Sequence, residues 1–135
     1  MPVGFEWAFN VSGGPPHIEP VVVANDEVLS VGELVNLESG EADAGASADT
    51  ALLGACVEAV NNADDGLTVK VIVNPDAVYA VTDANARLMG ATLDIASGGL
   101  GVTTDSNSDL IVFRTSTATE PTLVTFNGNH WLDLS

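Results

Sequence analysis

Basic residues are almost absent from this sequence. Among 135 residues there are only Lys70, Arg87 and Arg114, against 19 acidic residues, which gives a formal net charge of −16. Nucleic-acid binding draws its affinity from Lys and Arg side chains that replace counterions at the phosphates. Three scattered cations cannot supply that affinity, and an anionic membrane surface would repel the chain for the same reason. We therefore expect neither a nucleic-acid partner nor a membrane partner.

Cysteine and long apolar runs are also scarce. Cys56 is the only cysteine, so no disulfide can form within the chain. It lies in the apolar run LLGACVEAV with no cation beside it to lower the thiol pKa, which favours an inert core residue over a reactive thiol. No apolar run is long enough to span a bilayer, and the N-terminal one is too short for a secretion signal. We expect a chain that is made in the cytoplasm.

The sequence does contain a repeated β pattern. Hydrophobic residues make up 46% of the chain, which is enough for a packed domain. The run LTVKVIVN at 67–74 has apolar residues at alternate positions, the period of a strand with one buried face. Similar runs, separated by turns rich in Gly, Asn and Asp, lie at 20–25, 33–38, 51–60, 77–82, 109–115, 122–127 and 130–134. This spacing predicts an all-β fold, a small β-barrel or a β-sandwich.

One segment departs from this pattern. Residues 83–90, DANARLMG, begin with Asp83 as a candidate N-cap and end with Gly90, which suits a helix C-terminus. Helix-favouring residues lie between them. We expect one short helix here.

The N-terminal segment is rich in aromatic residues. Phe5, Trp7 and Phe9 alternate within VGFEWAFNV, so an extended segment would present them on one face. SGGPP then separates an extended arm, residues 1–16, from a single β domain, residues 17–135. Burying three aromatic side chains contributes about 5–9 kcal/mol, less than the roughly 9–18 kcal/mol that ordering this segment costs. The arm therefore needs a sheet edge, in its own domain or in a neighbouring subunit, and deleting residues 1–14 should leave the fold intact.

Motifs for catalysis are weak. GASAD at 45–49 lacks the second glycine of a nucleophile elbow, and SGGLG at 97–101 lacks the third glycine of a dinucleotide-binding turn. His17 and His130 stand alone in the sequence, remote from Cys56, so their spacing predicts no zinc site. We expect no enzymatic activity and no cofactor.

One turn carries oxygen side chains at alternate positions, as calcium loops do. These are Asp105, Asn107 and Asp109 in DSNSD, although Leu110 and Ser116 stand where a calcium loop has its glycine and glutamate. A bound calcium or magnesium ion is the functional interpretation. An ordinary Asx-rich hairpin turn is the alternative, and it is the one we favour.

The order of these features resembles a known family. Within residues 28–134, the stretches GELVNLESG, LLGACVEAV, GLTVKVIVNPDAVYAV and RLMGATLDIASGGLGVTTDSNSDLIVF are similar in pattern and spacing to capsid decoration proteins of tailed bacteriophages, also called cement or head-stabilising proteins. The resemblance implies a small β-barrel or β-sandwich of the β-tulip or SH3-like type on the outer face of the phage head. It also implies a structural virion protein, made in the host cytoplasm, that binds the major capsid protein and self-associates, with trimers favoured.

Aromatic residues are the expected contact residues of such a protein, because they dominate interface hot spots. Phe5, Trp7 and Phe9 are the first candidates. Trp131 in NHWLDL is a second candidate, with a core-closing last strand as the alternative interpretation. The alternative function is a carbohydrate-binding β-sandwich module, with or without calcium dependence, for which only Trp7, Tyr79 and Trp131 are available as Trp or Tyr platforms.

Overall fold

The computed structural model describes residues 4–61, 67–96, 98–104 and 106–132. Within these residues the chain forms thirteen β-strands and no helix, which confirms the all-β prediction. The strands are β1 (Glu6–Asn10), β2 (Ile18–Val22), β3 (Val28–Leu29), β4 (Leu34–Glu38), β5 (Glu41–Ala44), β6 (Leu52–Ala55), β7 (Val60–Asn61), β8 (Thr68–Ile72), β9 (Ala77–Val81), β10 (Thr92–Ile95), β11 (Val102–Thr103), β12 (Leu110–Arg114) and β13 (Thr122–Phe126).

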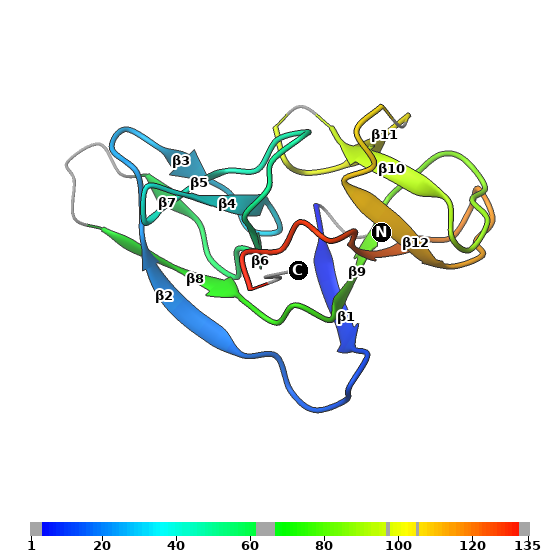
Figure 1. Cartoon of the computed structure of the whole chain (residues 1–135), viewed down its shortest axis with the longest axis horizontal. Coiled ribbons are helices and arrows are strands. Elements are labelled where there is room, and N and C mark those ends of the chain that lie inside the picture. The colour runs from blue at the N-terminus through cyan, green and yellow to red at the C-terminus, as the bar shows by residue number, and fades with distance from the viewer. Residues whose placement is uncertain (1–3, 62–66, 97, 105, 133–135) are drawn as a thin grey trace.

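The strands form two units, which lie side by side in Figure 1. One unit is a six-stranded antiparallel sheet in the order β1-β9-β13-β12-β10-β11. The other unit combines the three-stranded sheet β5-β4-β6 with the pairs β2-β8 and β3-β7. The six-stranded order is open at β1 and β11, so the described strands do not close into a barrel.

Each unit has its own hydrophobic core. The first core gathers around Tyr79 under the six-stranded sheet, and the second core lies between the smaller sheets around Val69 and Val71. β6 supplies both cores, because successive side chains of a strand point to opposite faces. Leu52 belongs to the first core and Leu53 to the second. This shared strand therefore connects the packing of the two units.

A glycine in β6 allows this close packing. A Cβ atom on Gly54 would lie 1.9 Å from the backbone oxygen of Ile72 and 2.7 Å from the hydroxyl oxygen of Tyr79. The amide of Ala55, the next residue, donates a hydrogen bond to the same hydroxyl at 3.3 Å. Glycine is therefore required where the backbones of β6 and β8 meet beside the Tyr79 hydroxyl.

The prediction of a helix at residues 83–90 is wrong, because the structure has no helix there. This segment runs beside the end of β12, where Arg87 and Ser116 exchange backbone hydrogen bonds at 3.1 and 2.9 Å. The amide of Gly90 donates to the carbonyl of Val112 at 2.9 Å. The Asp83 carboxylate binds the Arg87 guanidinium at 2.6 Å. So short a helix gains few hydrogen bonds for its nucleation cost, and pairing with β12 supplies the backbone with partners instead.

The N-terminal segment is a strand of the six-stranded sheet. β1 pairs antiparallel with β9, so of the two alternatives left open by the sequence, the structure shows pairing within its own domain. After β1, the amide and hydroxyl of Ser12 donate to the Asp76 carboxylate at 2.8 and 2.5 Å. The Asn10 amide nitrogen Nδ2 donates to the carbonyl of Pro15 at 3.1 Å. Hydrogen bonds therefore hold the segment and its SGGPP connection to the domain.

Candidate protein-binding surfaces

The aromatic residues of the N-terminal segment do not share one face. Phe5 is 2% exposed and meets Tyr79 edge-on, with ring centroids 6.4 Å apart, and Trp7 packs against the same core. A β-bulge between Trp7 and Phe9 turns Phe9 to the other face, where its ring lies 5.3 Å from that of Phe113. The prediction of a single aromatic face is therefore wrong. Phe5 belongs to the first core of the protein itself.

Trp7 borders an apolar depression of about 370 Å³, called here the Trp7 depression. Ile18, Val31 and Val57 line it and are 43%, 55% and 38% exposed. The Trp7 indole nitrogen donates to Asn10 Oδ1 at 3.1 Å, which fixes the ring at the edge of the depression. The structure thus places one predicted contact residue, Trp7, among solvent-exposed aliphatic side chains.

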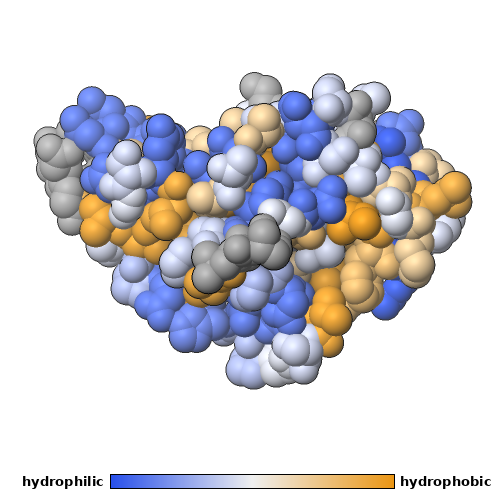
Figure 2. All heavy atoms as spheres, viewed as in Figure 1, coloured by the Kyte–Doolittle hydropathy of each residue, from blue (hydrophilic) through white to orange (hydrophobic). Residues whose placement is uncertain are grey.

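Phe9 lies on the outer face of the six-stranded sheet, the face turned away from the first core. The Arg114 guanidinium lies 6.0 Å from the ring centroids of both Phe9 and Phe113. Leu123, which is paired with Arg114 across β12 and β13, extends this partly exposed group. Figure 2 shows hydrophobic surface over the part of the molecule where Figure 1 places β1 and β12.

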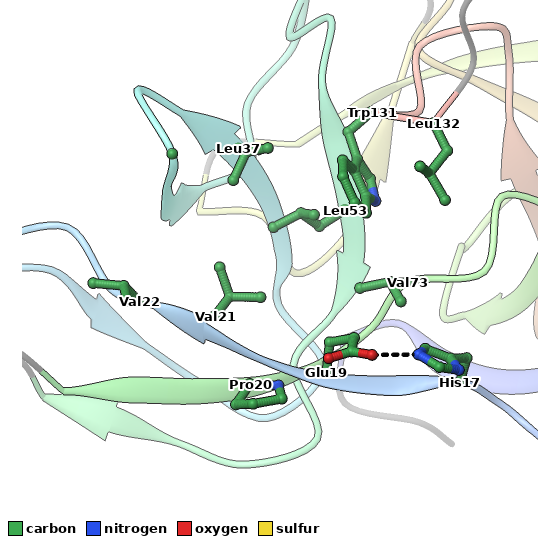
Figure 3. Close-up of a pocket in the computed structure, with 11 residues that line it drawn as sticks. His17, Glu19, Pro20, Val21, Val22, Leu37, Leu53, Val73, Trp131 and Leu132 are labelled. Atoms are coloured by element: carbon green, nitrogen blue, oxygen red, sulfur yellow. Dashed lines mark hydrogen bonds and ion pairs between the residues drawn. The ribbon is translucent and has the colours of Figure 1, made fainter.

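The Trp131 pocket, named here for the residue at its margin, is larger, at about 590 Å³. It opens between β2, β6 and the C-terminal residues Trp131 and Leu132 (Figure 3). Its apolar lining consists of Pro20, Val21, Val22, Leu37, Leu53, Val73, Trp131 and Leu132. Val21, Leu37 and Trp131 also pack against the second core. The pocket therefore lies at the edge of the second core and opens to the solvent.

Polar groups lie at two places in this pocket. The indole nitrogen of Trp131 is buried and has no hydrogen-bond partner among the residues that the structure describes. An unsatisfied buried donor costs about 1–3 kcal/mol. Elsewhere on the lining, His17 Nε2 lies 2.5 Å from Glu19 Oε1, and both side chains are half or more exposed. The pocket thus combines apolar walls with an unused donor and an exposed carboxylate.

His130 fixes the chain beside this pocket. Its buried ring donates from Nε2 to the carbonyl of Leu53 at 2.9 Å, because a carbonyl can only accept. Nδ1 is therefore the acceptor for the amide of Leu132, at 3.1 Å. The amide of Trp131 donates to the carbonyl of Leu52 at 3.0 Å. His130 is thus a structural residue that positions Trp131.

The candidate cation turn is built as a structural turn. Asp105 lies outside the described residues. Asp109 is 2% exposed, and its two carboxylate oxygens accept the amides of Ala48 and Ile95 at 2.8 and 2.9 Å. The side-chain amide of Asn107 faces another loop, where it donates to Ser47 Oγ at 2.8 Å. Asp109 therefore joins two other segments of the chain through its carboxylate.

Asp94 accepts the amides of this turn. Its carboxylate oxygens accept the amides of Ser106 and Asn107 at 2.9 and 2.8 Å. Burial acts to raise the pKa of Asp94, but these amide bonds outweigh it and the pKa is lowered. No group of three or more His, Cys, Asp or Glu side chains arranged to hold a metal occurs within the described ranges.

A group of carboxylates surrounds the β4–β5 hairpin. Burial raises the pKa of Glu27, and the neighbouring Asp43 raises it further, against a lowering by the Ala44 amide. A hydrogen bond and repulsion from Asp43 raise the pKa of Glu38. Burial, with repulsion from Asp43 as a smaller cause, raises the pKa of Asp49. Like charges therefore lie close together here at neutral pH.

The cysteine is buried, as its sequence context indicates. Cys56 is 2% exposed and belongs to the second core. Burial raises the pKa of its thiol to about 12, and the charges of Glu33 and Glu58 contribute to the rise. Since the thiolate is the reactive form, this position suits an inert core residue.

Comparison with known sequences identifies no family for this chain. No protein-family model matches the chain, and no curated protein has a significant match to its sequence. In the part of the chain that the structure describes, no helix is long and apolar enough to cross a membrane.

Proposed function

We propose that this protein is a non-enzymatic structural protein of a phage virion, which binds the outer surface of the head and cements neighbouring capsid subunits. The proposal joins the resemblance of residues 28–134 to capsid decoration proteins with one structural observation, the Trp7 depression. The major capsid protein is the proposed partner. We keep the β-tulip or SH3-like type and a trimeric state as parts of the same proposal.

The Trp7 depression carries this proposal because it is apolar surface on a strongly acidic chain. Ile18, Val31 and Val57 are each more than a third exposed beside a partly buried tryptophan, on a protein with a net charge of −16. Exposed aliphatic side chains that gather around an aromatic residue mark protein-binding surfaces. The charge keeps free copies apart and soluble until they find such a surface.

Carbohydrate binding has less support. Sugar-binding sites present exposed aromatic rings as platforms, but Tyr79 is 1% exposed in the first core. Trp7 and Trp131 are both partly buried, because they pack against the first and the second core. None of the three residues therefore presents a fully exposed ring as a platform for a sugar.

The first experiment is to measure the copy number of this protein in purified particles, relative to the major capsid protein, by quantitative mass spectrometry. We expect hundreds of copies in a fixed ratio, since a cement protein occupies every equivalent position of the shell. Absence of the protein from particles, or a few copies in no fixed ratio, would contradict the proposal.

A substitution in the Trp7 depression tests the contact itself. Val31→Asp places a charge among the aliphatic side chains, so we expect occupancy of the particles to fall at least tenfold, as at an interface hot spot. Val28→Asp is the matched control, because Val28 is also exposed and makes the same charge change outside the depression. Equal occupancy of the two variants would remove the depression from the interface.

A further inference from the structure

We propose that the Trp131 pocket binds an extended peptide segment of another protein. The segment would place an apolar side chain between β2 and β6, a backbone carbonyl against the Trp131 indole nitrogen, and a Lys or Arg near Glu19. The inference rests on the proposed function only for the identity of the protein that donates the segment.

The apolar walls set the kind of anchor. The pocket measures about 590 Å³ and continues the second core, so an inserted side chain meets Val21, Leu37 and Leu53 as a core residue would. Sites of a few hundred Å³ with apolar walls and few polar groups are typical of specific binding pockets. In Figure 3 the walls come from strands on both sides of the opening, which suits an inserted side chain better than a flat contact.

The indole nitrogen sets the polar contact. It is buried without a partner among the described residues, and in Figure 3 it lies on the ring edge nearer Leu132. Leu132 is 46% exposed, so it can turn aside more readily than a core residue. A peptide backbone offers the carbonyl acceptors that a tryptophan N–H needs, and aromatic-lined grooves of other domains bind extended peptides.

Charge selects a basic segment. Glu19 lines the pocket, and Gly40 brings the β4–β5 turn to its margin. In that turn Glu38 stands directly opposite Glu41, an arrangement that destabilises a strand pair through repulsion. Among the described residues none of the pocket-lining side chains is Lys or Arg. A cation from a partner would be attracted to the Glu19 carboxylate, where it would compete with the His17 ring, whose Nε2 lies 2.5 Å from Glu19 Oε1.

Addition of a strand to β2 is disfavoured as the mode of binding. The carbonyl of His17 accepts from the amide of Val73, and the amide of Val23 donates to the carbonyl of Leu67. The odd-numbered residues of this run therefore bond toward β8, and the even-numbered ones face the open edge. One of those is Pro20, which has no N–H. The segment is thus held by its side chain and one carbonyl.

Selection from a library of random twelve-residue peptides, displayed against the immobilised full chain at 150 mM NaCl, tests the inference. We expect an enriched pattern of one or two large apolar residues flanked by Lys or Arg. Failure to enrich any pattern would overturn the inference. So would enrichment of acidic sequences, or native mass spectrometry that finds a small apolar compound in the pocket.

Two pairs of variants then place the enriched peptide. Trp131→Phe keeps the ring but removes the donor, so we expect the affinity to fall about fivefold, the worth of one hydrogen bond. Trp7→Phe is its control, because the Trp7 donor is bonded within the chain. Glu19→Gln should weaken binding about two- to fivefold, whereas Glu120→Gln, with the same change of net charge in another turn, should not. Equal effects within either pair would place the peptide elsewhere.

The outcomes separate this inference from the proposed function. Peptide binding at the pocket together with absence from particles would leave the pocket assigned and end the capsid proposal. Stoichiometric copies in particles with no enriched peptide would do the reverse.

Discussion

At Gly54 the backbone of β6 lies against that of β8 with no room for a side chain. The Cβ atom of Gly54→Ala would overlap the carbonyl oxygen of Ile72, so a backbone has to shift. Overpacking of this kind costs about 1–3 kcal/mol, and we expect the upper end, measured as the free energy of unfolding in urea. Gly40→Ala is the control, because its Cβ atom would meet nothing within 4 Å. Equal losses for both would mean that backbone conformation, and not the close approach, explains the glycine.

The outcome for single residues shows what local sequence can and cannot predict. It correctly indicated, from the apolar run around Cys56, that this residue is buried. It does not reveal the bulge after Trp7, because a bulge arises from the pairing with β9. Trp131 was a candidate contact residue, but its pocket includes Val21, Leu53 and Val73, which are far apart in sequence. Nothing local in the sequence indicates that these residues meet.

β1 is a strand whose contribution to stability the sequence did not predict. Deleting residues 1–10 should destabilise the domain, contrary to the expectation from sequence, because Phe5 fills the first core and β1 covers the edge of β9. We expect Phe5→Ala alone to lower the free energy of unfolding by about 3–5 kcal/mol, the usual cost of removing a buried aromatic ring. Val11→Ala is the control within the same segment, since Val11 is 57% exposed. An unchanged urea midpoint for the truncated chain would show that β1 is dispensable.

The existence of strands was easier to predict than their partners. Alternation in LTVKVIVN and turn residues between the runs predicted the all-β class correctly. The order β1-β9-β13 joins the two ends of the chain with its middle, and no local pattern determines such long-range pairing. The residues at 83–90 favour a helix locally, but β12 offers their backbone an edge to pair with, and that tertiary contact prevails.

For the whole molecule, the carboxylates predict an unusual dependence of stability on pH. Glutamates ordinarily titrate near 4.5. The pKa is raised in the folded protein for Glu27, Glu33, Glu38 and Asp49. A group with a raised pKa binds its proton more tightly when folded, so stability increases as the pH falls from neutral through the folded pKa. That gain is complete once the pH is below the value of the unfolded chain.

Two other carboxylates act in the opposite direction at lower pH. The pKa of Asp76 is lowered by hydrogen bonds from Ser12, and that of Asp94 by bonds from the turn amides, from an ordinary value of 3.8. Their stabilisation is lost as the pH falls through these lowered values. We therefore expect the melting temperature at low ionic strength to rise from pH 7 to a maximum between about pH 4 and 5, and then to fall.

Salt and one substitution separate the cause of this maximum from a general effect of acid. The net charge of −16 produces repulsion among the carboxylates, and salt screens this repulsion. We therefore expect 1 M NaCl to raise the melting temperature at pH 7 more than at pH 4.5. Asp43→Asn removes the charge that acts on Glu27, Glu38 and Asp49, and it should flatten the rise between pH 7 and 5. Asp26→Asn makes the same change of net charge near β3 and should leave more of the rise in place. A melting temperature that falls steadily from pH 7 would show that repulsion among the carboxylates around the β4–β5 hairpin does not destabilise the folded protein.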